Sequence, residues 1–322
     1  MRKAMLALLG LATVAAAPPP VPFTNLAPAF DAFEARTAGM DPARRVAEFR
    51  ATFDRLAPGL YTARDPAKLD RRIAAALAEF PAIRTAYRQV EREFPATLAG
   101  SVARFRKVFP DFVPPLPIYL THQLGVRDGG SDYVNGRKVM LFGADMIARL
   151  HNDDSLPTFL DHELFHLEHA RHFDDCDQLW CVLWQEGLAT HVAATLTPGA
   201  SDHQLLLDQP APNRAPTDAR WGEALCFVAT RFDAVDGGDI DAVFTGGAQA
   251  AGLPSRFGYY VGLRIAEQAG RERSLAALDR LDNEAARPVA AGALASLIAE
   301  AHAPCSPPAA TGPITRTAPR PA

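Results

Sequence analysis

The sequence lacks two features that would direct a chain to a membrane or to nucleic acid. Beyond the first 17 residues no uninterrupted apolar run reaches membrane-spanning length, and no basic cluster occurs, since 33 basic residues face 37 acidic ones. We therefore expect no nucleic-acid partner and no membrane association of the mature chain. A content of 48% hydrophobic and 22% charged residues also excludes a disordered or fibrous protein and provides for a sizeable core.

Cysteine is scarce, and the four cysteines lie in the second half of the chain, at positions 176, 181, 226 and 305. They are not clustered closely with other metal-binding residues, which argues against a zinc–thiolate site. Three disulfide pairings are open. Because Cys176 and Cys181 flank the connection between two predicted helices, a disulfide between them, or from either one to Cys226 or Cys305, would restrict that loop.

The start of the chain has the form of a secretory signal. Arg2 and Lys3 precede an apolar run that ends at Ala17, and Ala15 and Ala17 satisfy the small-x-small rule for cleavage. A membrane anchor is the alternative, but this apolar run is shorter than the roughly 20 residues that a helix needs to cross a bilayer. We therefore expect residues 1–17 to be removed and the protein to be exported, to the periplasm or outside the cell.

The rest of the sequence divides into three regions. Residues 18–112 form a helical N-terminal region, residues 113–302 contain a short sheet followed by further helices, and residues 303–322 form a Pro- and Ala-rich tail that is predicted to be disordered. We find no internal repeat. The middle region is therefore where we expect the functional site.

Capping residues, alternating hydrophobicity and turn residues predict where individual helices and strands lie. Two Asp-Pro pairs, at 41–42 and 65–66, each put a capping carboxylate before a proline at the first helical position. Alternation around Ile118 predicts a short strand, and Asn135-Gly136 between two extended runs is the strongest short hairpin signal. Helical periodicity returns after Asp154 and Ser155, either of which could cap the next helix, and continues in residues 178–196 and 217–302.

Residues 161–170 read DHELFHLEHA and contain an HExxH motif, from His162 to His166. On an α-helix, residues four apart lie ~40° apart around the axis and ~6 Å apart along it, so both imidazoles can bind one metal ion. Glu163 lies one step off that line, where a general base could hold a water molecule without binding the metal. The alternative is a solvated helix face with incidental histidines. Its apolar neighbours predict burial instead, and burying these groups unpaired would be costly.

A catalytic zinc usually needs a third protein ligand, and two candidates follow the motif. His172 matches the last position of HExxHxxGxxH, but His169 and Ala170 stand where the chain would leave the helix at a glycine, and no methionine follows Met146 to form a methionine turn. Glu186, in LWQEGLATHVAATL, is the second candidate. An antiparallel return helix would bring its carboxylate back to the two histidines.

At these residues the chain resembles gluzincin metallopeptidases, whose third-ligand helix often contains tryptophan near EG-A. It is most similar to bacterial exported zinc-dependent proteases that combine HExxH, an EG-A helix and a later helix with tyrosine and glycine, matched here by RFGYYVGLRIAEQAG, residues 256–270. The resemblance covers residues from about 115 to 270. Two positions depart from it: Glu168, where zincin helices more often carry a hydrophobic residue, and Thr190, where an acid could orient a ligand histidine.

The resemblance implies a Zn2+ site and the residues that work around it. The implied ligands are His162, His166 and Glu186, with Glu163 as the general base. A further donor is needed for the developing oxyanion. Tyr259 and Tyr260 are candidates by resemblance, and His191 is a third because it lies on the ligand helix; ordinary packing is the alternative for each tyrosine. His169 and His172 are assigned to the surface or to supporting positions behind the ligands.

The resemblance also implies a zincin-like α+β fold, mostly helical, with a small mixed β-sheet beside the HExxH helix. In that fold the strand before the active-site helix pairs with an extended peptide. RKVMLFG, residues 137–143, is therefore the expected substrate-binding edge.

Together these features predict an exported zinc metallopeptidase that acts on a peptide or protein substrate. The sequence has no GxMEN-type element to bind a free amine, which favours an endopeptidase over an aminopeptidase. A non-catalytic helical binding protein, with zinc absent or only structural, is the competing hypothesis. A hydrolase that acts on another kind of amide is a third.

Overall fold

The computed structural model describes residues 21–151, 154–245, 252–312 and 314. The predicted signal sequence, residues 1–17, lies outside the described residues. The described strands are β1 (Thr24–Asn25), β2 (Ile118–Thr121), β3 (Ser131–Val134) and β4 (Arg137–Gly143). The described helices are α1 (Ala27–Thr37), α2 (Pro42–Leu56), α3 (Pro66–Phe105), α4 (Ala144–Leu150), α5 (Leu156–His169), α6 (Leu179–Leu196), α7 (Arg214–Asp218), α8 (Trp221–Thr230), α9 (Gly237–Phe244), α10 (Phe257–Gly270), α11 (Leu275–Asp279) and α12 (Asn283–Glu300). None of the described helices is both long enough and apolar enough to cross a membrane.

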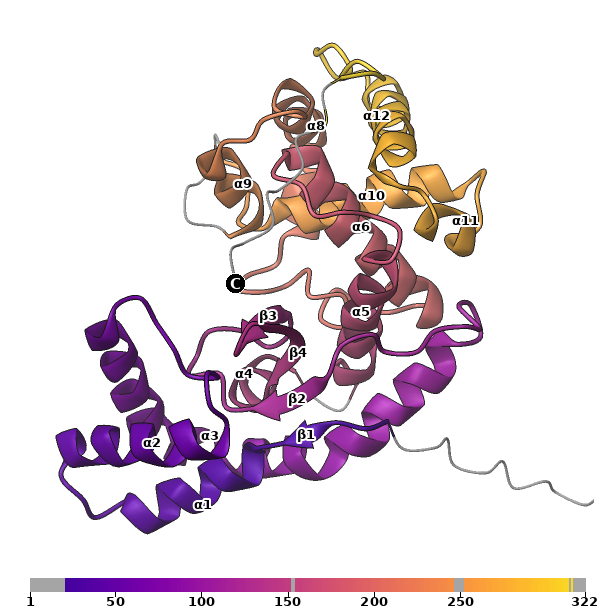
Figure 1. The fold of residues 1–322 in the computed structure, drawn as a ribbon. Helices are drawn as coiled ribbons and strands as arrows, with labels where there is room; N and C mark the ends of the chain where they lie inside the picture. The colour runs from indigo at the N-terminus through magenta and orange to yellow at the C-terminus, as the bar shows by residue number, and fades with distance from the viewer. Residues whose placement is uncertain (1–20, 152–153, 246–251, 313, 315–322) are drawn as a thin grey trace, which may run out of the picture.

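The two Asp-Pro pairs begin helices, as predicted. The Asp41 carboxylate accepts hydrogen bonds from the first free N–H groups of α2, and Asp65 does the same for α3. Helix α3 continues for 40 residues, through Pro81 and Pro95. It passes below the sheet and packs against α4 and α5 (Figure 1). The N-terminal region therefore supports the helix that carries the HExxH motif.

A hydrogen-bonded pair of side chains joins α3 to that helix. Arg104 on α3 donates from Nε and Nη2 to Oδ2 of Asp161 on α5, at 2.9 and 2.8 Å. The Asp161 side chain is fully buried, and it directly precedes His162. Burial raises the pKa of Asp161 to about 7 although Arg104 opposes the rise, so this contact is a partly exposed, hydrogen-bonded link between α3 and α5.

The sheet is small and mixed, with the strand order β1-β2-β4-β3. β2 runs parallel to β1 and β4, whereas β3 and β4 are antiparallel and form the predicted hairpin, in which Asn135 and Gly136 both have positive φ. The prediction that β4 is the free edge is wrong, because β4 pairs with β2 on one side and β3 on the other. Among the described strands, β3 is the open edge on this side. The fold is otherwise α+β and mostly helical, as predicted.

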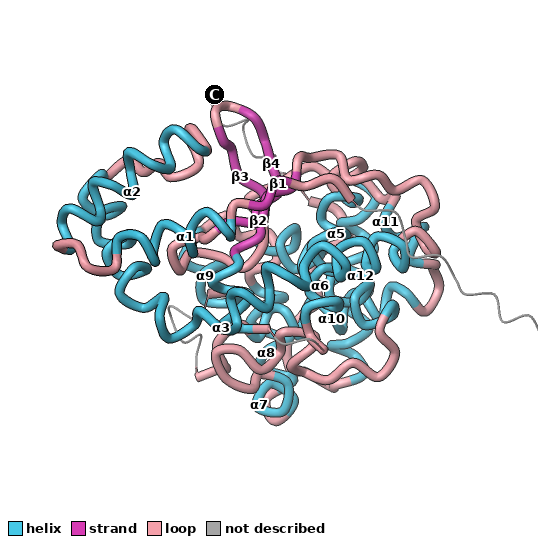
Figure 2. The backbone as a smooth tube through the Cα atoms, turned by 90° about the horizontal axis from the view of Figure 1, so that it is seen from below, coloured by secondary structure: helices cyan, strands magenta, loops and turns pink. Residues whose placement is uncertain are grey.

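The second half of the chain packs α5, α6, α10 and α12 together on one side of the sheet (Figure 2). Helices α6 and α10 approach very closely at Gly187 and Gly262. A Cβ on Gly262 would lie 2.6 Å from the carbonyl oxygen of Leu183 and 3.0 Å from Cα of Gly187. The two backbones can approach this closely only because both positions are glycine. The close approach brings the first half of α10 beside the middle of α6.

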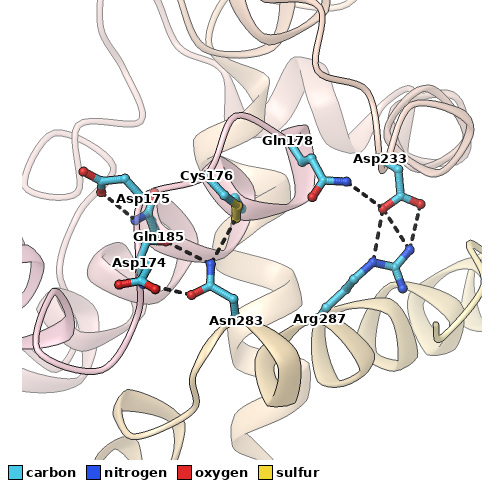
Figure 3. The surroundings of a disulfide bond; sticks show 9 residues. Asp174, Asp175, Cys176, Gln178, Gln185, Asp233, Asn283 and Arg287 are labelled. Carbon is cyan, nitrogen blue, oxygen red and sulfur yellow. Dashed lines mark hydrogen bonds and ion pairs between the residues drawn. A yellow bond between two sulfur atoms is a disulfide. The ribbon is translucent and has the colours of Figure 1, made fainter. Parts of the chain in front are cut away.

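The cysteines form two disulfides among the open pairings, Cys176–Cys181 and Cys226–Cys305. The first lies in the connection between α5 and α6. Figure 3 shows Asn283, at the start of α12, reaching this connection, where its amide donates to the carbonyl oxygen of Asp174. The connection is thus held by a disulfide within it and by a hydrogen bond to α12.

The second disulfide attaches the first part of the predicted disordered tail to α8. Arg287 of α12 adds to this attachment, because it donates to the carbonyl oxygen of Ala309 at 3.0 Å while it also pairs with Asp233 (Figure 3). Residues 303–312 contain no helix or strand. They are nevertheless in contact with the helical core through these two bonds.

Candidate metal centre

Three side chains from α5 and α6 converge on one point. Nε2 of His162 lies 3.0 Å from Nε2 of His166, and Oε2 of Glu186 lies 3.3 and 3.6 Å from these two nitrogen atoms. In a tetrahedral zinc site with ligand bonds of ~2.0–2.1 Å, neighbouring ligand atoms lie ~3.3 Å apart. The three atoms therefore have the spacing of one face of such a tetrahedron. Two imidazole nitrogens and one carboxylate oxygen are also donors that suit zinc.

The local sequence explains this convergence. His162 and His166 are one turn apart on α5, and α6 packs against α5 after the disulfide-bonded connection. Thr190 supports the arrangement from α6: its hydroxyl donates to the carbonyl oxygen of Glu186 at 2.8 Å and lies 3.5 Å from Nδ1 of His162. A lone pair of that hydroxyl faces the ring, so Nδ1 can carry the proton and Nε2 stays free to bind a metal.

The charges within this group are strongly coupled. Burial alone would raise the pKa of Glu186, but the charge of His166 and hydrogen bonds with both histidines outweigh it and hold that pKa well below its usual range. Burial opposes a charge on His166 as well, yet the Glu186 carboxylate raises the pKa of His166 to about 9. The pKa of His162 is lowered, mainly by burial. The three groups share a proton, and a metal ion bound here would displace that proton, because an imidazole must be neutral to bind a metal.

Glu163 lies beside the three ligands, against a glycine-containing loop. A Cβ on Gly129 would be 2.7 Å from Cδ of Glu163 and 2.8 Å from Cζ of Phe159, so only glycine fits there. Burial raises the pKa of Glu163 to about 8.

Asp128, in the same loop, accepts a hydrogen bond from Nε2 of the buried His151 at 3.1 Å. This loop was not predicted, although the adjacent pair Gly129-Gly130 before a strand is a signal for close backbone approach.

A cavity of about 440 Å³ opens beside this group. Residues of the hairpin and of helices α5 and α6 line it, together with Pro115 and Leu116. The lining residues include Gly130, Ser131, Lys138 and Met140 from the hairpin side and Glu163, His166, Leu167, Ala170, Asp175, Gln185 and Glu186 from the helical side. A ligand in this cavity would therefore contact the edge strand β3, the general-base candidate and two of the three metal-ligand candidates at once.

The two tyrosines of α10 differ in their surroundings. The ring of Tyr259 packs against Phe244 and lies under the guanidinium group of Arg256. Burial raises the pKa of Tyr259 above its usual range, and the negative charge of Glu186 adds to the rise, so its hydroxyl stays protonated. The hydroxyl of Tyr260 instead donates to Asp218 at 2.7 Å and accepts from Arg264 at 3.2 Å. The structure thus favours Tyr259 over Tyr260 as the donor candidate.

His191 and His172 do not join the group. Nε2 of His191 faces Gly270, at the far end of α10 from Tyr259, where a Cβ would lie 3.0 Å from it. His172 lies near Asp279 instead of His162 and His166, in agreement with the choice of Glu186 over His172. His169 is buried between the rings of Phe165 and Phe173.

Comparison with known proteins identified no relative: no family model, no curated protein and no solved structure matches this chain. Functional inference therefore depends on the residues and their geometry.

Proposed function

We propose that the protein is an exported, zincin-like metallopeptidase of the gluzincin type. One observation carries this proposal: two imidazoles and one carboxylate lie 3.0–3.6 Å apart, and a separate, partly buried carboxylate, that of Glu163, lies next to them. Zinc bound at this site would polarise the scissile carbonyl group and lower the pKa of a water molecule. Three protein ligands leave a fourth position open, as a catalytic site requires.

The surrounding side chains can perform the remaining steps. Glu163 accepts a proton from the attacking water and later delivers it to the leaving amine, a role that requires a carboxylate near the metal but not bound to it. Tyr259, whose hydroxyl stays protonated, donates a hydrogen bond to the oxyanion that develops at the scissile carbon. The loop at Gly129 packs directly against the carboxyl group of Glu163, because the missing side chain of the glycine leaves room for it.

The edge strand β3 supports a peptide as the substrate. β3 is paired only with β4 among the described strands, so its outer edge can bind an extended peptide through main-chain hydrogen bonds. Gly130 and Ser131, where β3 begins, line the cavity next to the metal ligands. An edge strand recognises a backbone and not a chain terminus, which favours an endopeptidase. The apolar side chains of Leu116, Met140 and Leu167 would receive a substrate side chain next to the scissile bond.

Export is supported by two features. The first 17 residues have the pattern of a signal sequence, and the described cysteines are all paired in disulfides, which are typical of oxidising compartments. Sequencing the N-terminus of protein recovered from the periplasm or medium tests this part; we expect it to begin at Pro18.

The activity is tested with the purified mature protein. Zinc content and hydrolysis of a peptide library are measured before chelation, after chelation and after zinc is restored. We expect cleavage that disappears with the metal and returns with it. Zinc-free protein, or zinc-bound protein that cleaves no peptide and binds one instead, would favour the non-catalytic binding protein. Hydrolysis of a non-peptide amide alone would favour the third alternative.

A further inference from the structure

A second group of metal-binding side chains lies at the C-terminal end of α5, just beyond His166. Glu168, His172 and Asp279 each offer one ligand atom, and these atoms lie within 4.8 Å of one another. Nε2 of His172 is 3.7 Å from Oδ2 of Asp279. Glu168 and His172 belong to the last turn of α5 and the turn that follows it, whereas Asp279 is the last residue of α11. The group therefore joins two parts of the chain that are more than a hundred residues apart.

The carboxylates of Glu168 and Asp279 are both buried, so placing them close together costs free energy. Glu168 is 6% exposed and Asp279 is 2% exposed. Two negative charges this close together in a poorly hydrated place repel each other, and each also loses its hydration. A cation among them would remove both costs.

Asp279 has little compensation from the protein itself. Within the described part of the chain, its Oδ1 atom is buried and has no hydrogen-bond donor, and no lysine or arginine lies within ion-pair distance of its carboxylate. Nδ1 of His169 lies 3.5 Å from Oδ1 of Asp279 but only 3.0 Å from the backbone oxygen of the same residue, so its proton is directed to the backbone oxygen. His172 lies on the other side, with Nε2 3.7 Å from Oδ2.

Glu168 does have a cationic neighbour. Nη1 of Arg171 lies 3.1 Å from both carboxylate oxygens of Glu168. The Arg171 side chain is 45% exposed, so this pair is partly screened by water and its guanidinium can move outward. Each carboxylate oxygen has two lone pairs, so Glu168 can keep Arg171 on one side and bind a metal on the other.

We propose that Glu168, His172 and Asp279 bind a second divalent transition-metal ion, with Zn2+ the preferred occupant. One imidazole and two carboxylates favour zinc over calcium, because calcium takes oxygen ligands and not imidazole. His172 is partly exposed and lies in a turn, so its ring can move the short distance needed to close around the ion. The ion would connect the end of α5 to α11, behind the wall that His169 and Ala170 form in the cavity. This inference does not require the protein to be a peptidase.

The test counts ions. Mature protein without a histidine tag is saturated with Zn2+ alone, freed of loosely bound metal by gel filtration and analysed for zinc per chain. We expect about two ions in wild type, about one in Asp279→Asn and about one in the double variant His162→Ala/His166→Ala, as two independent sites require. Asp54→Asn is the matched control, because it makes the same acid-to-amide change at an exposed position on α2 and should keep both ions.

A second measurement covers the case in which Asp279→Asn fails to fold. His172→Ala and Glu168→Gln are milder changes at the same site, and each should also bind one ion. In the double variant, added Zn2+ should raise the melting temperature, and this rise should vanish when His172→Ala is added.

The outcomes separate this inference from the proposed function. If wild type holds one ion that Asp279→Asn and His172→Ala both retain, the second site does not exist, while the first is untouched. If the double variant keeps an ion that depends on His172, the second site stands even if no peptide is ever cleaved.

Discussion

Gly187 of α6 and Gly262 of α10 are in backbone contact, and this contact sets how the helix that carries Glu186 crosses the helix that carries Tyr259 and Tyr260. A Cβ on Gly187 would overlap the carbonyl group of Gly262, so the helices could not cross as they do with any larger residue. Gly187 directly follows Glu186, and Gly262 lies three residues, nearly one turn, after Tyr259. The crossing therefore places Tyr259 on the side of Glu186 and leaves Tyr260 to pair with Asp218.

Gly187→Ala should separate these helices. We expect a loss of unfolding free energy of about 1–3 kcal/mol, as for other overpacked sites, together with lower activity because Tyr259 and Glu186 move apart. Gly100→Ala on α3 is the control, since a Cβ there meets nothing within 4 Å and alanine favours a helix; it should be neutral or stabilising. Urea unfolding measures both variants. Equal stability of Gly187→Ala and wild type would show that the crossing is not tight.

The metal ligands can be tested one at a time. His162→Ala, His166→Ala and Glu186→Ala should each lose the zinc bound at this site, because two protein ligands rarely hold the ion firmly. His191→Ala is the matched control, since it removes a histidine from the same helix as Glu186 but at a position that faces Gly270. Zinc is measured by mass spectrometry after dialysis. Full retention of zinc and activity by Glu186→Ala would mean that another residue is the third ligand.

Gly129→Ala should affect catalysis without affecting metal binding. The added methyl group would lie 2.7 Å from Cδ of Glu163, so the carboxyl group or the loop must move. A displacement of this size commonly costs ~100-fold in rate, and we expect peptide hydrolysis to fall by roughly that factor. Zinc content should stay at the wild-type value. Unchanged hydrolysis would show that the position of Glu163 is not set by this loop.

The buried imidazole of His122 gives a prediction about pH. Burial outweighs the nearby Asp145 carboxylate and lowers the pKa of His122 to about 4, while the N–H of Leu124 donates to its Nδ1 at 3.0 Å. In the unfolded chain the pKa is ~6.5, so below that pH the unfolded state binds a proton that the folded state does not. The contribution of His122 to stability is therefore full above pH ~6.5 and is lost as the pH falls toward 4.

NMR titration of the folded protein measures this directly. The His122 ring resonances should not shift until the pH approaches about 4, whereas an exposed histidine shifts near pH ~6.5. A His122 midpoint near 6.5 would contradict the burial argument. The acid-dependent loss in unfolding free energy from this one group should be on the order of 3 kcal/mol between the two pH limits.

Features governed by neighbouring residues could be predicted from the sequence. The caps at Asp41 and Asp65 and the hairpin at Asn135-Gly136 follow from local hydrogen bonds and backbone preferences, and the structure confirms all three. The grouping of Glu186 with the HExxH histidines was predicted from a pattern of spacing and apolar residues. The structure brings these side chains together.

Features governed by distant contacts could not be predicted in the same way. The hairpin signal at Asn135-Gly136 predicts the pairing of β4 with β3, but no local signal predicts the parallel pairing of β4 with β2, which leaves β4 without a free edge. The choice between Tyr259 and Tyr260 depends on how two helices cross, and the choice among cysteine pairings depends on the whole fold. Gly129 was missed because its importance comes from Glu163, which is 34 positions away in the sequence and adjacent in space.

Glu163→Gln tests the central claim most directly, with zinc content and the rate of peptide hydrolysis measured on the same sample. Glutamine keeps the size of the side chain and can still hydrogen-bond, but it cannot accept the proton from the attacking water. We expect zinc content and thermal stability close to wild type and a rate at least ~100-fold lower. Wild-type and Glu163→Gln proteins that cleave a peptide equally fast would contradict this mechanism, whatever metal they contain.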